Sequence, residues 1–308
     1  MEKIPKLLKE RLKKLIPDYK TFEIAWLKKP DAGVRINTLL AEKEKTIKIL
    51  MQYEIEQLPF YENGFIVKQR QGLGNSMLHY AGHIYIQDIS SMIPPVLLEP
   101  KPYEYVLDIS AAPGSKTTQM ADMMNNTGVI IANEPHLKRA KSLVSNIERL
   151  GVINAIIMRR DGRQLTPYFE ETFDKILIDA PCSSEATAGR SYRVLNMWSI
   201  NSVKRLSGIQ RGLLVNAYKM LKPGGRMVYS TCTFAPEENE EVVSYLLKRF
   251  LDTTTIPVKI NGINAVRGIV EWEGKEYHPL VTNTLRIYPH KNRGEGFTIT
   301  VIEKIKTY

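Results

Sequence analysis

The chain of 308 residues lacks most of the features that assign a sequence to a specialised class of protein. No apolar run approaches the ~18 residues that a membrane span requires, and the charged N-terminus carries no secretory hydrophobic stretch. Two cysteines are too few for a disulfide scaffold, and they lack the CxxC or nearby histidine spacing of a structural zinc site. We therefore expect a cytoplasmic protein with no membrane anchor and no metal.

Positive charge is what the sequence has in excess. Lys and Arg number 43 against 33 Asp and Glu, which gives a formal net charge of +10 and a sequence pI near 9.4. Such an excess attracts polyanions, so nucleic acid is the first partner to consider; a generally basic surface without such a partner is the alternative. No spare hydrophobic helix stands out, so we expect a monomer.

The N-terminal part of the chain predicts a small α+β unit. We expect it to form a domain of residues 1–80, followed by a second domain of residues 81–308. The spacing of Leu7, Leu8, Leu12, Leu15 and Ile16 predicts a basic amphipathic helix, which we expect to pack on its own domain. The predicted elements are this helix within residues 1–30, a strand at 34–39, a helix over 42–53, and short β-like runs near 65–68 and 83–87.

From residue 104 onward, apolar strands alternate with helices. Continuous apolar strands separated by helices are typical of a parallel sheet that is covered on both faces. We therefore expect a doubly wound α/β domain, with strands at 284–288 and 297–302 forming an antiparallel hairpin at its edge. The other expected elements are strands at 105–109, 129–132, 155–158, 175–178 and 227–230, and helices over 117–124 and 137–150.

The loop after the first of these strands has the composition of a ligand-binding turn. Ligands of doubly wound sheets bind beyond the carboxyl ends of the strands. Residues 108–117 are rich in small side chains, which let the backbone approach a ligand, and they lead into a helix N-terminus with free amides. The loop is neither a GxGxxG fingerprint nor a Walker loop, so taken alone it is equally well explained as a tight turn.

Acidic residues after the next two strands favour a nucleoside ligand. Glu134 stands twenty positions beyond Gly114, where a carboxylate can accept hydrogen bonds from both ribose hydroxyls. Asp161 can accept from the exocyclic amine of an adenine, although an acid at a strand end is often only a helix cap. A ribose site without a pyrophosphate cradle suggests S-adenosylmethionine (AdoMet), and the missing glycine fingerprint disfavours an NAD-dependent dehydrogenase.

Both cysteines of the chain follow sheet strands. One cysteine in such a place is best explained as a small buried side chain, but Cys182 and Cys232 together favour chemistry. Methylation of cytosine at carbon 5 needs a thiolate that adds to carbon 6, and a second thiol can assist release. Asp179 is placed to supply a proton or hydrogen bond at ring nitrogen 3, with electrostatic support from Lys116. The residues alone leave open which thiol attacks.

Several motifs support this chemistry jointly. They are Val34-Arg35-Ile36-Asn37-Thr38, Gln87-Asp88-Ile89-Ser90-Ser91-Met92, Ala111-Ala112-Pro113-Gly114-Ser115-Lys116-Thr117, Ala132-Asn133-Glu134, Asp179-Ala180-Pro181-Cys182-Ser183, Tyr229-Ser230-Thr231-Cys232-Thr233 and Glu237-Glu238-Asn239-Glu240. With them the chain resembles the NSUN (Sun-domain) family of RNA 5-methylcytosine methyltransferases from about residue 34 to its end.

The resemblance implies a Rossmann-like class I methyltransferase that uses AdoMet and acts on rRNA or tRNA, with segments 111–119, 125–128 and 161–163 somewhat closer to the rRNA members. It implies that Cys232 is the nucleophile and that Cys182 assists release, and that residues 1–80 bind RNA. The cofactor contacts that it implies are Ser110, Ala111, Ala112, Pro113, Gly114, Ser115, Lys116, Glu134, Asp161 and Asp179.

The chain departs from the family pattern at two places. Ser110 stands where the family usually has cysteine, at a turn position. The family's Pro-Cys-Ser-Gly-x-Gly loop is Pro-Cys-Ser-Ser-Glu-Ala at residues 181–186, and lost glycines can stiffen the loop that admits the target base. An RNA-binding assembly factor with little turnover is therefore the alternative function. Basic residues of 185–211, interleaved with Tyr192 and Trp198, are candidates for gripping RNA.

Overall fold

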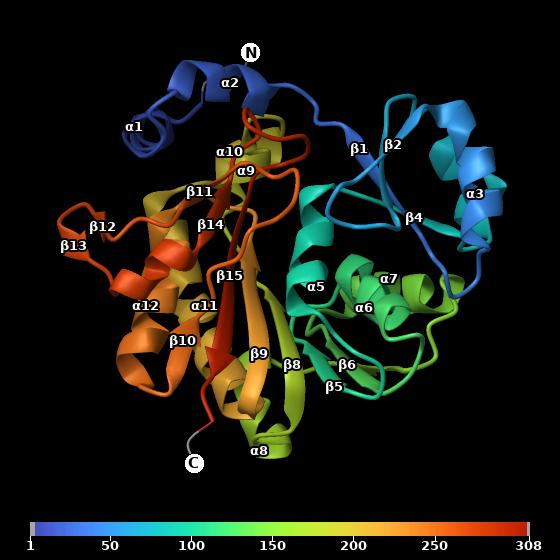
Figure 1. The fold of residues 1–308 in the computed structure, drawn as a ribbon. Helices are drawn as coiled ribbons and strands as arrows, with labels where there is room; N and C mark the ends of the chain where they lie inside the picture. Colours follow the sequence, from blue (N-terminus) through green and yellow to red (C-terminus); the bar gives the residue numbers. More distant parts are fainter. Residues whose placement is uncertain (1–3, 307–308) are drawn as a thin grey trace.

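A mixed nine-stranded sheet forms the centre of the computed structural model, which describes residues 4–306 (Figure 1). No helix in this part of the chain is long and apolar enough to cross a membrane. The helices are α1 (Lys6–Leu15), α2 (Tyr19–Leu27), α3 (Lys43–Leu50), α4 (Met77–Tyr80), α5 (Ile93–Leu98), α6 (Ser115–Met123), α7 (Leu137–Arg149), α8 (Thr166–Phe169), α9 (Glu185–Ala188), α10 (Tyr192–Met197), α11 (Ile200–Met220) and α12 (Glu240–Arg249). The strands are β1 (Ala32–Ile36), β2 (Ile55–Gln57), β3 (Gly64–Val67), β4 (Ile84–Gln87), β5 (Tyr105–Asp108), β6 (Val129–Asn133), β7 (Ala155–Met158), β8 (Phe173–Asp179), β9 (Leu221–Thr231), β10 (Thr253–Thr255), β11 (Ala265–Arg267), β12 (Glu271–Trp272), β13 (Lys275–Glu276), β14 (Leu285–Ile287) and β15 (Phe297–Lys304).

The parallel part of the large sheet has the strand order that creates a ligand crevice. Strands β7, β6, β5, β8 and β9 are parallel neighbours in that order. The chain runs outward from β5 through β6 and β7, and it then returns to place β8 and β9 on the other side of β5. Ligands of such sheets bind at this reversal, beyond the carboxyl ends of β5 and β8. The expected doubly wound α/β fold is confirmed.

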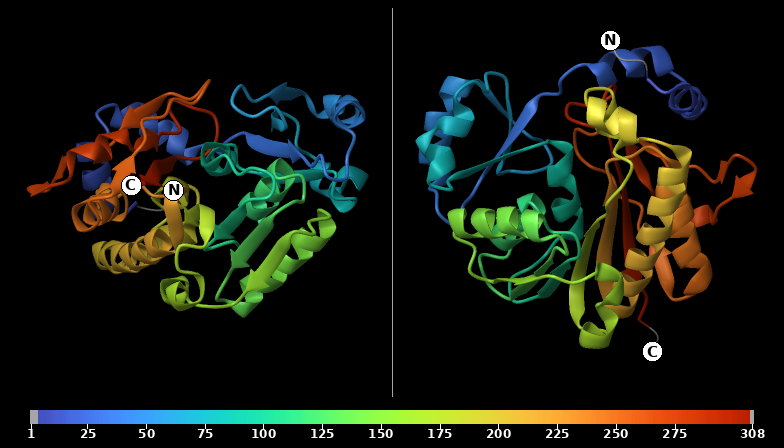
Figure 2. Two further views of the ribbon diagram at one scale, coloured as in Figure 1. Left: turned by 60° about the horizontal axis from the view of Figure 1, so that its bottom comes forward. Right: turned by 180° about the vertical axis from the view of Figure 1, so that it is seen from behind.

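Helices cover both faces of this parallel sheet. Val106 and Leu177 contact the cluster that includes α5, α6 and α7, whereas Leu107 and Ile176 contact the cluster that includes α11 and α12. Neighbouring side chains of a strand point to opposite faces of the sheet. Because both faces are covered, both side chains must be apolar, and each fully buried side chain contributes about 1.5–3 kcal/mol to the free energy of folding. Figure 2 shows α11 and α12 lying together on the face opposite α6 and α7.

The C-terminal strands correct one expectation. As predicted, β14 and β15 pair antiparallel. However, β15 also pairs antiparallel with β9, where Thr298 lies opposite Thr231. It therefore lies inside the sheet, and β11 forms the edge on this side. Pairing between strands far apart in the chain leaves no local sequence pattern, so the sequence could not indicate this position.

The second sheet is antiparallel and packs over α6 and α7 (Figure 1). Its strand order is β2-β3-β1-β4. The fully buried Arg35 of β1 pairs with Asp122 of α6 at 3.4 Å, and it donates to Thr118 at 2.9 Å. Because β4 belongs to this sheet, the expected boundary at residue 80 falls before its last strand.

The N-terminal segment forms two helices, not the single expected one. Pro17 removes a backbone donor and pushes the preceding Ile16 into an extended conformation (φ −120°), which ends α1. Leu8 of α1 and Trp26 of α2 pack against α9, α10 and the segment after β9, not against the small sheet (Figure 1). The expected domain of residues 1–80 thus consists of two parts with different packing partners, and its role in RNA binding stays a prediction. Residues 1–3 of the expected helix lie outside the described residues.

Candidate active site at the carboxyl ends of the strands

Both cysteines open into one cavity of about 340 Å³ beyond the carboxyl ends of the parallel strands. Larger cavities of about 620 and 810 Å³ flank α2, but neither cysteine lines them. Five of the predicted site residues line the 340 Å³ cavity: Ser110, Glu134, Asp179, Cys182 and Cys232. The sequence therefore predicted the crevice and the convergence of the two thiols in it correctly.

The two thiols are in direct contact, and their proton affinities differ. The Sγ atoms of Cys182 and Cys232 are 3.2 Å apart, and Ser184 Oγ lies 3.5 Å from Cys232 Sγ. The hydrogen bond from Cys182 lowers the pKa of Cys232 below its usual value, with help from Ser184 and against the effect of burial. The same hydrogen bond, together with burial, raises the pKa of Cys182 well above its usual range. Cys232 is therefore the thiol that ionises first, which favours it as a nucleophile.

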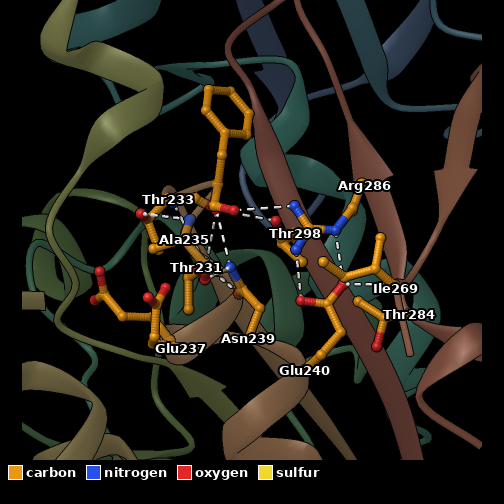
Figure 3. Close-up of polar contacts among 12 residues, drawn as sticks. Thr231, Thr233, Ala235, Glu237, Asn239, Glu240, Ile269, Thr284, Arg286 and Thr298 are labelled. Carbon is orange, nitrogen blue, oxygen red and sulfur yellow. Dashed lines mark hydrogen bonds and ion pairs between the residues drawn. The ribbon is translucent and has the colours of Figure 1, made fainter. Parts of the chain in front are cut away.

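A buried ion pair holds the loop that carries Cys232. Arg286 of β14 and Glu240 of α12 pair in bidentate fashion with almost no exposure, and Arg286 Nη1 donates to the carbonyl of Phe234 at 2.9 Å. Figure 3 shows Arg286 beside Glu240 and Asn239 directed at the backbone of the loop. Asn239 donates to the carbonyls of Thr233 and Ala235, at 3.1 and 2.9 Å.

A different set of side chains holds the loop that carries Cys182. The buried carboxylate of Glu238 accepts a hydrogen bond from the Ser183 amide at 3.0 Å and another from Gln210 Nε2 at 2.8 Å. The Ser183 hydroxyl donates to the same carboxylate and lies 2.7 Å from Thr233 Oγ1. Gln210 Nε2 also donates to the carbonyl of Pro181 at 2.8 Å. The loop is therefore tied both to α11 and to the Cys232 loop.

The residues that replace the family's glycines give this loop a defined shape. Ser184 adopts the left-handed conformation (φ 57°) that glycine usually supplies. Glu185 is buried, and its carboxylate accepts from Trp198 Nε1 at 2.9 Å and from the Phe234 amide at 3.2 Å. The amide of Ala186 donates to the carbonyl of Cys232 at 3.1 Å. The altered sequence thus joins the two cysteine loops.

Lys116 and Asp179 form an ion pair beside the thiols. Their Nζ and Oδ2 atoms are 2.8 Å apart, and Ser230 Oγ donates to Oδ1 of Asp179 at 3.0 Å. Burial acts to lower the pKa of Lys116, but the Asp179 carboxylate outweighs it and the pKa is raised. Lys116 therefore keeps its positive charge next to the carboxylate that lines the cavity.

Glu134 and Arg139 contribute another part of the cavity lining. Oε2 of the buried Glu134 has no hydrogen-bond partner among the described residues, although Arg139 lies 3.0 Å from it as an ion-pair partner. Arg139 also donates to the carbonyl of Ala112 at 2.7 Å. Gly114, the N-cap residue before α6, has φ +107°, and a side chain there would press on Leu143 at 3.1 Å. Glu134 thus places a buried carboxylate beside a close backbone turn, and its contact with the cofactor stays a prediction.

The remaining predicted residues lie near the cavity or beyond its lining. Residues 111–116 form the turn and the start of α6 behind it. Asp161 accepts from the Arg163 amide at 2.9 Å, so it caps the short turn Gly162–Gln164, and it also pairs with the Arg163 guanidinium. Whether these residues contact the cofactor stays a prediction.

Sequence reasoning missed several residues of the site. Arg139, Ser184 and Phe297 line the cavity, and Glu238 binds the Cys182 loop; the signals in the sequence were the changed loop at 184–187 and the Glu237-Glu238-Asn239-Glu240 motif, to which no role was assigned. Of the expected RNA-gripping residues, Trp198 is buried in the apolar cluster beneath α1 and α2. Arg190 and Arg211 are bound in ion pairs to Glu295 and Glu241, whereas Tyr192, Arg193, Lys204 and Arg205 are exposed.

Two family models match the chain. The model described as 16S rRNA methyltransferase RsmB/F matches residues 95–303, and that of the N-terminal domain of 16S rRNA methyltransferase RsmF matches residues 4–89. The first match covers more than half of the chain.

Similar proteins point the same way. A tRNA (cytosine(49)-C(5))-methyltransferase of Pyrococcus abyssi is 44% identical over 98% of this chain and 97% of its own length. The ribosomal RNA small subunit methyltransferase F of Vibrio vulnificus is 36% identical over 98% of this chain, but this chain spans only 64% of that protein. A crystal structure of a methyltransferase homolog protein from Pyrococcus horikoshii has a TM-score of 0.81 at 32% identity, covering 98% of this chain and 100% of that chain.

Proposed function

Because this chain belongs to the 16S rRNA methyltransferase RsmB/F family, we propose that it transfers a methyl group from AdoMet to carbon 5 of a cytosine in RNA. The contact between the two thiols, 3.2 Å apart in the strand-end cavity, is the observation that carries the proposal. A cytosine must leave its stack to reach this cavity, so an unpaired or flipped nucleotide is the substrate.

Cys232 performs the first covalent step. Its sulfur adds to carbon 6 of the ring, which makes carbon 5 nucleophilic enough to take a methyl group. Of the two thiols it is the one with the lowered pKa, because Cys182 and Ser184 share hydrogen bonds with it. The family motif and the local electrostatics therefore assign the attack to the same thiol.

Asp179 and Lys116 support the ring during the attack. Negative charge accumulates toward ring nitrogen 3 as the sulfur adds, so a proton or hydrogen bond is needed there. Asp179 lines the cavity and is paired with Lys116 at 2.8 Å, so it is placed to share a proton or hydrogen bond with ring nitrogen 3. The buried ammonium of Lys116 offsets part of the developing charge.

Cys182 assists the release. After methylation the proton on carbon 5 must leave with a base, and its electron pair then expels the Cys232 sulfur from carbon 6. The high pKa of Cys182 has its largest cause in the hydrogen bond to Cys232. That cause is removed once the Cys232 sulfur is bonded to carbon, so Cys182 becomes easier to deprotonate at the stage where a base is required.

AdoMet supplies the methyl group as an electrophilic sulfonium when it is bound. Glu134 is the residue that would hold the ribose hydroxyls, and the turn of residues 110–116 would lie along the remainder of the molecule. Arg139, which pairs with Glu134 at 3.0 Å, would lie beside the ribose.

The RNA to test first is tRNA, with ribosomal RNA beside it. The Pyrococcus relative at 44% identity is named for a tRNA cytosine, and the Vibrio relative at 36% identity for small-subunit ribosomal RNA. Bisulfite sequencing of tRNA and rRNA from cells with and without the gene would identify the cytosine. A site that is methylated only when the gene is present supports the proposal.

Two substitutions test the covalent roles. We expect Cys232→Ala to abolish both methyl transfer and any denaturation-resistant RNA complex, and Cys182→Ala to let that complex accumulate. Equal loss of the complex in both variants contradicts the assigned roles. Binding of AdoMet by calorimetry without any tritium transfer to unmodified RNA would favour the assembly-factor alternative instead.

A further inference from the structure

Glu238 is a buried carboxylate without a basic partner. Its side chain has no solvent exposure, and each of its hydrogen-bond donors is neutral: the Ser183 amide, the Ser183 hydroxyl and Gln210 Nε2. Burying a carboxylate without a cation costs stability. The nearby Glu240, in contrast, pairs with Arg286. Neutral donors do not fully compensate the charge of a buried carboxylate. The presence of Glu238 at this position therefore indicates a role in the reaction.

The carboxylate of Glu238 binds Ser183, the residue that follows Cys182. Both donors of Ser183 point to its carboxylate, so the backbone on the carboxyl side of Cys182 is fixed in direction. Gln210 bridges Glu238 to the carbonyl of Pro181, which fixes the backbone on the other side. Ser183 Oγ also lies 2.7 Å from Thr233 Oγ1, next to Cys232. The side chain of Glu238 is therefore connected to the backbone on both sides of Cys182 and, through Ser183, to the loop that carries Cys232.

We propose that Glu238 is a positioning residue for the release step, holding Cys182 against the carbon 5 side of the adduct. The inference rests on the proposed function, in which Cys182 assists release. Glu238 itself lines no part of the cavity, so it acts through Ser183 and Pro181 and not by touching the substrate.

The same geometry makes the release step depend on pH. Burial raises the pKa of Glu238 to about 7, with Glu185 adding to the rise and the Ser183 hydrogen bonds opposing it. When ionised, the carboxylate accepts from all three neutral donors. When protonated, one oxygen must donate instead, and the contact with the Ser183 hydroxyl has to reorganise.

The titratable groups around Glu238 come from several elements. Glu185 of α9 and Cys182 face it across the loop, and Tyr229 of β9 donates to its backbone carbonyl at 2.6 Å. Helix α11 presents the neutral Gln210. None of these groups is a cation, so protonation of the carboxylate is not opposed by an ion pair.

The lifetime of the covalent complex tests the inference. Wild type, Cys182→Ala, Glu238→Gln and Ser183→Ala are mixed with AdoMet and with unmodified tRNA transcripts or 16S rRNA. The denaturation-resistant complex is then followed between about pH 6 and pH 8. Glu241→Gln is the matched control, because Glu241 pairs with Arg211 and Lys275 and contacts neither cysteine loop.

We expect Glu238→Gln to lengthen the lifetime of the complex by about 10- to 100-fold at pH 8, as a misplaced catalytic group does. It should slow release far more than it slows formation of the complex, leave KM unchanged, and remove the rise in release rate through pH 7. Ser183→Ala should show a smaller effect in the same direction, and Glu241→Gln none. Ser183→Ala decides the matter if Glu238→Gln does not fold.

Release at the wild-type rate by folded Glu238→Gln, or equal slowing of complex formation and release, would overturn the inference. Failure of the proposed function looks different, because wild type would then form no complex or Cys232→Ala would still methylate RNA.

Discussion

The two cysteine loops of this protein are held in place by different kinds of charge. The Cys232 loop is anchored by Arg286 and Glu240, a buried pair in which each charge is compensated by the other. The Cys182 loop is anchored by Glu238, which meets only neutral donors. The sulfur assigned to attack is thus held by an ion pair whose charges compensate each other, whereas the sulfur assigned to release is held by a carboxylate whose pKa burial raises to about 7.

The difference fits the two steps that the thiols are proposed to perform. A nucleophile must lie in one place before substrate arrives, and a compensated ion pair with fixed geometry provides that. The helper acts later, when its partner sulfur is already bonded to the ring. The charge of Glu238, which anchors the Cys182 loop, can therefore change with pH, although the buried carboxylate lowers the stability of the fold.

The largest expected effect is on the Cys232 loop. Arg286→Ala leaves Glu240 buried without its cation and the Phe234 carbonyl without its donor, so we expect a loss of about 3–5 kcal/mol in the free energy of unfolding. Lys275→Ala removes an exposed lysine from its pair with Glu241, which keeps Arg211 as a partner, and should cost about 0–1 kcal/mol. Urea unfolding of both variants measures this, and an equally small loss in both would mean that the Arg286–Glu240 pair does not anchor the Cys232 loop.

The next effect is a pH dependence of stability that belongs to the Cys182 loop. Burial raises the pKa of Glu238 from 4.5 to about 7, so its contribution to stability is complete below pH 4.5 and is lost as pH rises through 7. Relative to Glu238→Gln, wild type should lose about 2–3 kcal/mol between these pH values.

A variant of the other loop provides the control for this pH dependence. Thr298→Val removes a hydrogen bond to the Thr233 carbonyl and should cost about 1 kcal/mol at both pH values. A constant difference in stability between wild type and Glu238→Gln across this pH range would mean that Glu238 does not titrate there.

The smallest effect concerns the reactivity of Cys232. Removing the Ser184 hydroxyl takes away one of the two hydrogen bonds that lower the pKa of this thiol. Alkylation of Cys232 by iodoacetamide at neutral pH should slow roughly fivefold, since one such hydrogen bond is worth about 1 kcal/mol. Alkylation should slow equally in Ser184→Ala and in Ser184→Gly. A difference between the two variants would assign the effect to the backbone conformation at position 184 instead.

Local patterns were sufficient to predict most of the fold. The strands of the parallel sheet are short apolar runs buried on both faces, and the helices between them have amphipathic spacing, so both are visible in the sequence. The end of α1 was also encoded locally, at Pro17. The inner position of β15 was not, because it depends on pairing with β9 across a long stretch of chain.

The site was predictable only where residues follow strands. Asp179, Cys182 and Cys232 each stand at or just past a strand end, and the topology brings such positions together. Glu238 and Arg286 lie 55 and 52 positions away from Ser183 and Phe234, the loop residues whose backbone they bind. A sequence without the fold gives no sign that these side chains meet, so the supports of the two loops emerged only from the structure.

The most direct test of the account is to identify the cysteine that bonds to the base. RNA containing 5-fluorocytidine blocks release, because fluorine replaces the proton that must leave carbon 5, so the covalent complex can be digested and its modified peptide sequenced by mass spectrometry. The account predicts that the nucleotide is attached to Cys232, with Cys182 free. Attachment to Cys182 would contradict it.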